Sequence, residues 1–203
     1  LHLSIRRQRQ MCIRDRCKRG QRMFHNRGTG SMGFGLPASI GACLAAGGRR
    51  TICVDGDGGF QMNIQELETV RRLGLPIKCF VVNNDGYASI RSSQTGYFGR
   101  LVGADATSGL TLPDVTRVAA AYGLPVARID RADGLEQRIA DVLATPGPVV
   151  CEVIVRRDEP RIPRLASFRT PDGRMVSRPI EDLFPFLDRE EFAENMLIPM
   201  VAE

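Results

Sequence analysis

Short apolar runs alternate with helix-forming segments through the middle of the chain. The runs are rich in β-branched residues, are bounded by turn residues, and occupy residues 51–54, 77–82, 126–129 and 149–155. These features are typical of strands buried on both faces of a parallel sheet. Helices are predicted around them at residues 36–46, 61–73, 113–122 and 135–143. The alternation predicts an α/β fold, with a parallel β-sheet flanked by helices.

The regular pattern ends near residue 156. Five prolines, at positions 160, 163, 171, 179 and 185, exclude long regular elements beyond that point. An apolar cluster at 183–187 favours an arm that packs on a partner or closes over a site, and the alternative is a loose tail. We therefore predict three parts: a disordered basic tail (1–21), an α/β domain (22–160) and an irregular C-terminal arm (161–203).

Polar residues follow two of the predicted strands at the point where each strand ends. Asp55-Gly56-Asp57-Gly58-Gly59 follows the first strand, and Asn83-Asn84-Asp85-Gly86 follows the next. A right-handed crossover brings the ends of parallel strands to one edge, so Asp57 and Asn84 are expected to converge. Their carboxylate and amide oxygens suit Mg²⁺, which often shares its ligands with phosphate. The glycines let the backbone approach that phosphate, and a helix starting near residue 61 adds its positive end.

Other phosphate and metal motifs do not fit these residues. The stretch from Gly56 is not a G-x-G-x-x-G dinucleotide fingerprint, and no Gly-Lys-Ser/Thr loop is present. An EF-hand loop starting at Asp55 would need glycine where Phe60 stands. A solvated acidic turn after a strand is the simplest alternative. The asparagine pair at the matching place argues against that alternative.

Two segments together resemble the thiamine-diphosphate-dependent superfamily of acetolactate synthases and 2-oxo-acid decarboxylases. Gly56-Asp57-Gly58, then 24 residues, then Asn83-Asn84 is similar to the cofactor motif of that superfamily, and residues 30–42 are similar to the stretch preceding it. The resemblance runs from about residue 22 to the C-terminus. It corresponds to the diphosphate-binding domain, the last of three in the full-length enzymes.

The resemblance implies a role for each matching residue. Asp57 and Asn84 would be side-chain ligands of Mg²⁺, and the Gly86 carbonyl would be the third protein ligand. The Gly30 carbonyl would accept a hydrogen bond from the amino group of the cofactor. Met32 would hold the cofactor bent, although an ordinary core methionine is the alternative. The remaining contacts, from the backbone to the diphosphate, would come from Gly56, Gly58, Gly59, Tyr87 and Ala88.

The family's activity is the decarboxylation of a 2-oxo acid, followed by transfer of the acyl carbanion to a carbonyl acceptor. The resemblance also implies a homo-oligomer, a dimer or tetramer. No catalytic residue is assigned, because the activating glutamate of the family lies in an N-terminal domain to which no part of this chain corresponds. The chain by itself is therefore expected to be inactive. These residues do not determine whether a flavin such as FAD also binds.

The stretch after the asparagine pair leaves the reaction open. Asp85-Gly86-Tyr87 looks more like simple 2-oxo-acid decarboxylases, and the chain lacks the tryptophan typical of acetolactate synthases at this place. In contrast, Pro171-Asp172-Gly173-Arg174 resembles acetolactate-synthase-like proteins. A simple decarboxylase is one alternative, and a non-catalytic nucleotide- or Mg²⁺-binding module is another. Arg91 could pair with a substrate carboxylate or serve a structural role.

Charge is distributed unevenly along the 203 residues. The chain has a net charge of +5, but residues 1–27 hold nine of the Arg and Lys residues against one Asp, and the rest is mildly acidic. A nucleic-acid-binding arm or a transit peptide would be Arg-rich in this way, but the tail lacks aromatic residues for stacking on bases. It resembles translated sequencing adaptor, so neither nucleic acid nor membrane is expected as a partner.

The cysteines form no C-x-x-C pair. Cys53, Cys79 and Cys151 fall in predicted strands and Cys43 in a predicted helix, so buried free thiols are expected. Such thiols suit a reducing compartment, and the cytoplasm is predicted as the location. Both histidines lie near the N-terminus, which excludes a histidine-based zinc site or catalytic triad in the core.

Overall fold

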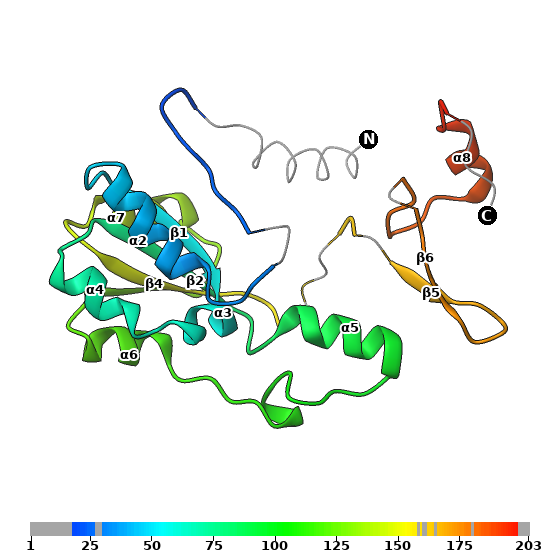
Figure 1. The fold of residues 1–203 in the computed structure, drawn as a ribbon, viewed down its shortest axis with the longest axis horizontal. Coiled ribbons are helices and arrows are strands. Elements are labelled where there is room, and N and C mark those ends of the chain that lie inside the picture. The colour runs from blue at the N-terminus through cyan, green and yellow to red at the C-terminus, as the bar shows by residue number, and fades with distance from the viewer. Residues whose placement is uncertain are drawn as a thin grey trace. The chain divides into compact units, whose positions relative to one another are not determined.

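The computed structural model describes residues 18–26, 30–157, 159, 162–164, 166–179 and 181–198. The described residues divide into two units, one within residues 25–159 and one that contains residues 18–24 and the described residues from 162 onward (Figure 1). Most of the predicted basic tail lies outside the described residues. The boundaries of the three predicted parts stay predictions.

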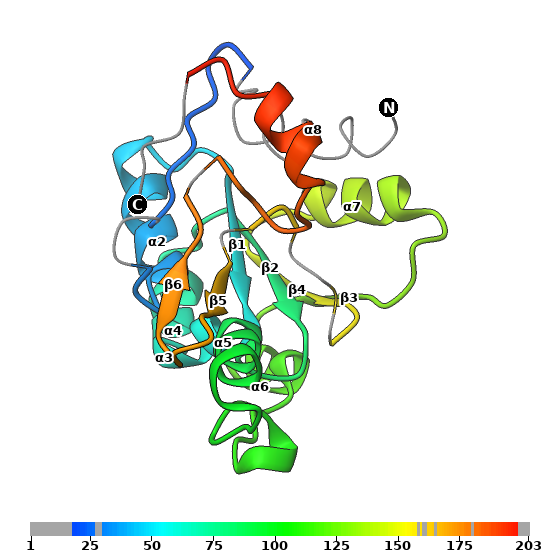
Figure 2. The same cartoon turned by 90° about the vertical axis from the view of Figure 1, so that its right-hand side faces the viewer.

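The larger unit is built on a parallel sheet, as predicted. Its strands lie in the order β1-β2-β4-β3 (Figure 2). Their bounds are β1 (Thr51–Gly56), β2 (Ile77–Asn83), β3 (Val126–Ile129) and β4 (Val149–Ile154). All neighbouring pairs are parallel, with Cys53 opposite Cys79 and Val82 opposite Val153. The carboxyl ends of β1 and β2 therefore meet at one edge, where the site residues follow.

Helices pack on both faces of this sheet. Their bounds are α2 (Gly35–Ala45), α3 (Asp57–Met62), α4 (Glu66–Arg72), α5 (Ala88–Phe98), α6 (Val115–Ala121) and α7 (Leu135–Ala144). Residues of α2, α3, α4 and α6 form the larger core cluster with Cys79, Val81 and other strand residues of one face. On the other face, Val142 of α7 joins a smaller cluster with Cys151 and Phe80. The predicted α/β fold with a parallel sheet flanked by helices is confirmed.

Strand β1 is covered on one face and open on the other. Cys53 is 4% exposed in the larger core, whereas Ile52 and Val54 on the opposite face are 53% and 67% exposed. Such alternation follows from the two-residue period of a strand. The second face of β1 is therefore not packed in the part of the chain that the structure describes.

The predicted single helix at 61–73 is wrong, because the segment forms two helices. Helix α3 already begins at Asp57, so Gly58 and Gly59 are helical and not part of an open turn. The chain then leaves helical geometry at Asn63, whose side chain donates to the Gly33 carbonyl at 2.8 Å. Asparagine favours such breaks because its side chain competes with the backbone for hydrogen bonds. The spacing of apolar residues continues through the break and conceals it.

Helix α5 was not predicted. Its one buried residue is Arg91, and the segment contains three Ser, one Thr, one Gln and one Gly among its 11 residues. It therefore has no apolar stripe, which is the signal used to recognise helices that pack on a sheet. The other predicted helices are found within two residues of their expected ends.

The C-terminal arm contains short elements. Strands β5 (Ser167–Arg169) and β6 (Met175–Ser177) form an antiparallel hairpin, and helix α8 spans Arg189–Glu194. Asp182 is 2% exposed and pairs with Arg189 at 2.7 Å and Arg178 at 3.5 Å. The Arg178 guanidinium also lies 4.4 Å from the ring centre of Phe168. The described part of the arm is therefore folded on itself, and a loose tail is the wrong description.

Two further expectations can be compared with the described residues. Cys43, Cys53, Cys79 and Cys151 are buried free thiols, as predicted. Burial raises the pKa of Cys151 to about 11, so this thiol is protonated at neutral pH. None of the helices in the described residues could span a lipid bilayer.

Candidate functional site

The two predicted site segments meet at the edge of the sheet. Strand β1 ends at Gly56 and β2 ends at Asn83, and the chain leaves both strands on the same side. The Gly86 N–H donates to Oδ2 of Asp57 at 2.9 Å. Asp57 is 5% exposed, and its Oδ1 accepts from the Gly58 N–H at 2.8 Å. A buried carboxylate thus joins segments that are 29 residues apart in sequence.

The side chain of Asn84 has an oxygen that needs a partner. Its Oδ1 is buried and has no hydrogen-bond partner in the described structure. An unsatisfied buried acceptor costs about 1–3 kcal/mol, which a bound cation would offset. The Gly86 carbonyl accepts one hydrogen bond, from the Ala88 N–H at 3.2 Å, and carbonyl oxygens have two lone pairs. The three predicted ligands therefore fit a divalent cation in donor type.

The acidic turn is the name used here for residues 55–59, the last three of which begin helix α3. Its glycines 58 and 59 leave no room for side chains. A Cβ at Gly58 would lie 2.3 Å from Cε1 of Tyr87 and 3.3 Å from Cε of Met32. A Cβ at Gly59 would lie 2.4 Å from Oδ1 of Asp55. Met32 is 44% exposed, so the alternative of a core methionine is wrong. Met32, Gly58 and Tyr87 form one surface beside the predicted metal ligands.

The predicted backbone donors already have partners in this structure. The Tyr87 N–H donates to the Ala104 carbonyl at 2.9 Å, and the Ala88 N–H donates to Gly86. A phosphate contact from the Tyr87 N–H would therefore require Ala104 to release it. Gly30 stands at φ +61, in the left-handed region that favours glycine, and its amide donates to the Asn26 carbonyl at 3.1 Å. The cofactor contacts of these residues stay predictions.

Asp55 lies just behind the turn and was not among the predicted site residues. Burial raises its pKa, while hydrogen bonds from the Gly56 and Gly35 N–H groups act in the opposite direction. A Cβ at Gly35 would lie 2.5 Å from Oδ2 of Asp55. Asp55 therefore connects the start of α2 to the acidic turn.

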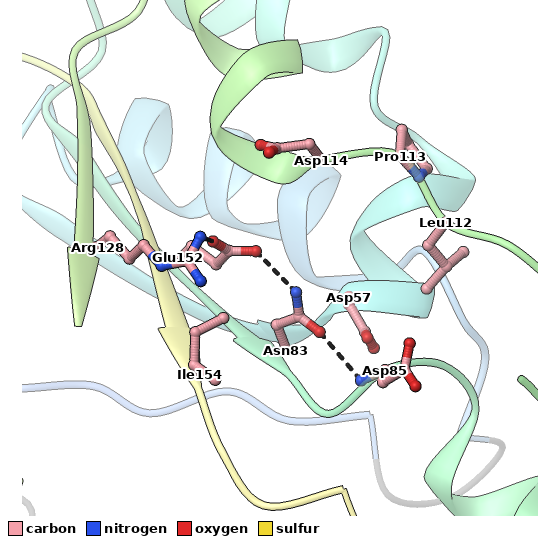
Figure 3. Close-up of a pocket in the computed structure, with 9 residues that line it drawn as sticks. All are labelled: Asp57, Asn83, Asp85, Leu112, Pro113, Asp114, Arg128, Glu152 and Ile154. Carbon is pink, nitrogen blue, oxygen red and sulfur yellow. Dashed lines mark hydrogen bonds and ion pairs between the residues drawn. The ribbon is translucent and has the colours of Figure 1, made fainter. Parts of the chain in front are cut away.

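A polar cavity of about 290 Å³ opens beside Asp57 (Figure 3). The Asn83 side chain donates to Oε1 of Glu152 at 2.7 Å, and Arg128 pairs with Oε2 of Glu152 at 3.2 Å. Four carboxylates and one guanidinium lie among the lining residues, and this charge favours a cation nearby. The lining consists of Asp57, Asn83, Asp85, Leu112, Pro113, Asp114, Arg128, Glu152 and Ile154.

Arg91 faces the main chain of residues 83–86, which we call the asparagine turn. It is 5% exposed, and its guanidinium donates to the carbonyls of Asn84, Asp85 and Arg157, each at 2.8 Å. This geometry supports a structural role for Arg91 and not a pairing with a substrate carboxylate.

Arg157, Asp105 and Glu152 also contact this region, and sequence reasoning missed them. Arg157 pairs with the fully buried Asp105 and lies 3.5 Å from the Asp85 carboxylate. Arg157 lies 52 and 72 positions from Asp105 and Asp85, and Glu152 lies 69 positions from Asn83, so no local motif marks these residues. The described residues contain no cluster of three or more His, Cys, Asp or Glu arranged for a metal. The candidate cation site thus consists of one carboxylate, one amide and one carbonyl.

Comparison with known proteins agrees with this geometry. A family model described as the C-terminal TPP binding domain of thiamine pyrophosphate enzymes matches residues 8–153, so the match begins inside the predicted basic tail. The chain is 34% identical over 157 residues to acetolactate synthase 2, chloroplastic, of Brassica napus. It is 36% identical over 139 residues to the acetolactate synthase large subunit of Cyanidium caldarium.

These matches cover most of this chain and a small part of each relative. They include 75% of this chain and 25% of the Brassica protein, and 68% of this chain and 24% of the Cyanidium protein. The chain thus spans about a quarter of the length of these relatives. From the family match, the parallel sheet and the joined acidic and asparagine turns, we conclude that the chain belongs to the thiamine pyrophosphate enzymes and contains their C-terminal domain, which binds thiamine pyrophosphate (thiamine diphosphate).

Proposed function

We propose that this chain is the Mg²⁺- and thiamine-diphosphate-binding part of an acetolactate-synthase-like enzyme. The complete enzyme would decarboxylate a 2-oxo acid and transfer the acyl carbanion to a carbonyl acceptor. The similarity to acetolactate synthases supports this reaction class. The observation that carries the proposal is the 2.9 Å contact between Asp57 and Gly86, beside the buried Asn84 oxygen that lacks a partner.

Each ligand residue contributes a different property to the cation site. Asp57 supplies the negative charge, and the N–H groups of Gly58 and Gly86 fix its two oxygens. Asn84 and the Gly86 carbonyl supply neutral oxygens, which complete half of an octahedral shell and leave room for phosphate oxygens and water. The cation would in this way hold the diphosphate at the edge of the sheet.

The glycine-rich surface has a separate role. Gly58 lets Tyr87 and Met32 pack against the backbone, and these two side chains would provide an apolar wall for the cofactor. When bound, thiamine diphosphate supplies the thiazolium carbon that adds to the 2-oxo acid, and its ring takes up the electron pair left behind when carbon dioxide departs. The residues of this chain orient that cofactor and exclude water. We assign no proton-transfer residue to this chain, and we propose that it works as part of a homo-oligomer.

The test measures cofactor-dependent stability in the full-length protein. We expect Mg²⁺ plus thiamine diphosphate to raise the Tm, and we expect Asp57→Asn to abolish the rise because it removes the only charge among the proposed ligands. Asp114→Asn is the matched control, because Asp114 lines the same cavity but caps helix α6. It should respond as the wild type does.

Two results would contradict the proposal. One is a full response of Asp57→Asn to Mg²⁺ and thiamine diphosphate. The other is a response to ATP or NAD with none to thiamine diphosphate, which would identify a non-catalytic nucleotide-binding module.

A further inference from the structure

Two consecutive peptide units in the asparagine turn are each held at both ends. A trans peptide unit is planar, and its C=O and N–H groups point in opposite directions. A partner at each end therefore fixes the rotation of the whole unit. In this turn, both carbonyl groups have the same partner, the guanidinium of Arg91.

The first of these units joins Asp85 to Gly86. Its carbonyl accepts from Nη1 of Arg91 at 2.8 Å, and its N–H donates to Oδ2 of Asp57 at 2.9 Å. One rigid group thus lies between a buried cation and a buried anion, with its dipole aligned to both. Rotation of this unit would redirect Gly86, whose own carbonyl is a proposed ligand.

The second unit joins Asn84 to Asp85. Its carbonyl accepts from Nη2 of Arg91 at 2.8 Å, and its N–H donates to Oδ1 of Asn83 at 3.0 Å. Asn83 is held in turn by Glu152 of strand β4 at 2.7 Å. This unit begins at the residue that carries the buried side-chain oxygen without a partner.

The backbone of the turn needs such restraint. Asp85 has φ +61 and is the one non-glycine residue with positive φ in the described part of the chain. Conformations of this kind persist only where the surroundings determine them strongly. Gly86 has φ +117, and a Cβ there would lie 2.5 Å from the Ala104 carbonyl and 3.2 Å from Nη1 of Arg91.

Arg91 is itself tied to the next part of the site. Its Nη2 also donates to the Arg157 carbonyl, and the Arg157 side chain pairs with Asp105 and Asp85. The turn is thus enclosed between α5, the segment at 104–105 and the end of strand β4. These contacts of Arg91 and Arg157 involve none of the proposed ligand oxygens. The proposed ligand Asp57 contacts the turn through the Gly86 N–H.

We propose that Arg91 is a positioning residue for the cation: it fixes the two peptide units so that Asn84 and Gly86 present their oxygens toward Asp57. This inference rests on the proposed function. It assigns the affinity of the site for its cation partly to a side chain that does not contact the ion. Residues that orient metal ligands typically change metal affinity by about 10- to 100-fold when they are replaced.

The experiment titrates Mn²⁺ into the full-length protein with excess thiamine diphosphate, and follows free Mn²⁺ by electron paramagnetic resonance. We expect Arg91→Gln to raise the Kd for Mn²⁺ by about 10-fold or more. Arg91→Lys, which keeps the charge and some donors, should recover part of that affinity. Arg117→Gln removes the same charge from an exposed position on α6 and should leave the Kd unchanged.

Each outcome decides between the alternatives. A folded Arg91→Gln variant that binds Mn²⁺ as tightly as the wild type would overturn the positioning role and leave the proposed function intact. A wild-type chain that takes up no Mn²⁺ would overturn both. If Arg91→Gln does not fold, Asn83→Ala decides, because it frees the N–H end of the Asn84–Asp85 unit; an unchanged Kd in that variant would overturn the inference.

Discussion

At the scale of single residues, the proposed cofactor surface depends on positions where no side chain fits. Gly58 lies between Tyr87 and Met32, and an added Cβ would be 2.3 Å from the Tyr87 ring. A ring carbon cannot give way without moving the whole side chain. The close contact between Gly58 and the Tyr87 side chain therefore requires glycine at position 58.

Gly58→Ala tests this link. We expect the Kd for thiamine diphosphate to rise at least tenfold, because Tyr87 must move out of the surface that faces the cofactor. Calorimetric titration of the full-length protein in Mg²⁺ measures the change. Gly41→Ala in helix α2 is the control, since a Cβ there meets nothing within 4 Å and would raise helix propensity by up to about 1 kcal/mol. Equal affinities in the two variants would contradict the expected role of Gly58.

Asp105 should make the stability of the fold depend on pH. It pairs with Arg157, which also contacts Asp85 of the asparagine turn. Hydrogen bonds from Thr107 and Ser108, together with the charge of Arg157, lower the pKa of Asp105 below its ordinary value of 3.8. A carboxyl group with a lowered folded-state pKa stabilises the fold at all pH values above its unfolded pKa. That contribution is lost as the pH falls through the folded-state pKa.

We therefore expect Asp105→Asn to be less stable than the wild type at pH 7. The difference in the free energy of unfolding should shrink as the pH falls below 3.8, because the carboxyl group of Asp105 then binds a proton in the unfolded chain before it does so in the folded protein. Urea denaturation at several pH values between 7 and 3 measures it. A difference that stays constant across this range would show that the charge of Asp105 is not what stabilises the fold.

At the scale of elements, the strands could be predicted because burial and composition agree. Each strand of the sheet is a short apolar run, and the structure extends β1 and β2 by one or two polar residues at the end where the site begins. The helices were less predictable, for two physical reasons. Asn63 breaks a segment whose apolar spacing continues, and α5 buries Arg91 in place of an apolar stripe.

The unequal burial of β1 and β2 gives a matched prediction for the sheet. Val81 in β2 is completely buried, whereas Val54 in β1 is 67% exposed. We expect Val81→Ala to lower the free energy of unfolding by about 2 kcal/mol, since it removes buried methyl groups. Val54→Ala should change it by less than about 0.5 kcal/mol. Chemical denaturation of both variants compares them, and similar losses would mean that the second face of β1 is packed.

At the scale of the whole molecule, the topology explains why the site could be anticipated. A parallel sheet with adjacent β1 and β2 brings Asp57 and Asn84 to one edge, whatever the intervening sequence. The residues that hold them could not be anticipated. Arg157, Asp105 and Glu152 reach the turn from distant segments through contacts that depend on the folded backbone. Sequence motifs indicated the proposed ligands, and only the structure identified the residues that contact their turn.

The most direct test is the location of the cation. Anomalous diffraction from crystals of the full-length protein with Mn²⁺ and thiamine diphosphate would give its position. We expect one ion about 2.0–2.2 Å from an oxygen of Asp57, from Oδ1 of Asn84 and from the Gly86 carbonyl, with diphosphate oxygens completing the shell. An ion bound elsewhere, or an Asn84 side chain turned away from Asp57, would contradict the account.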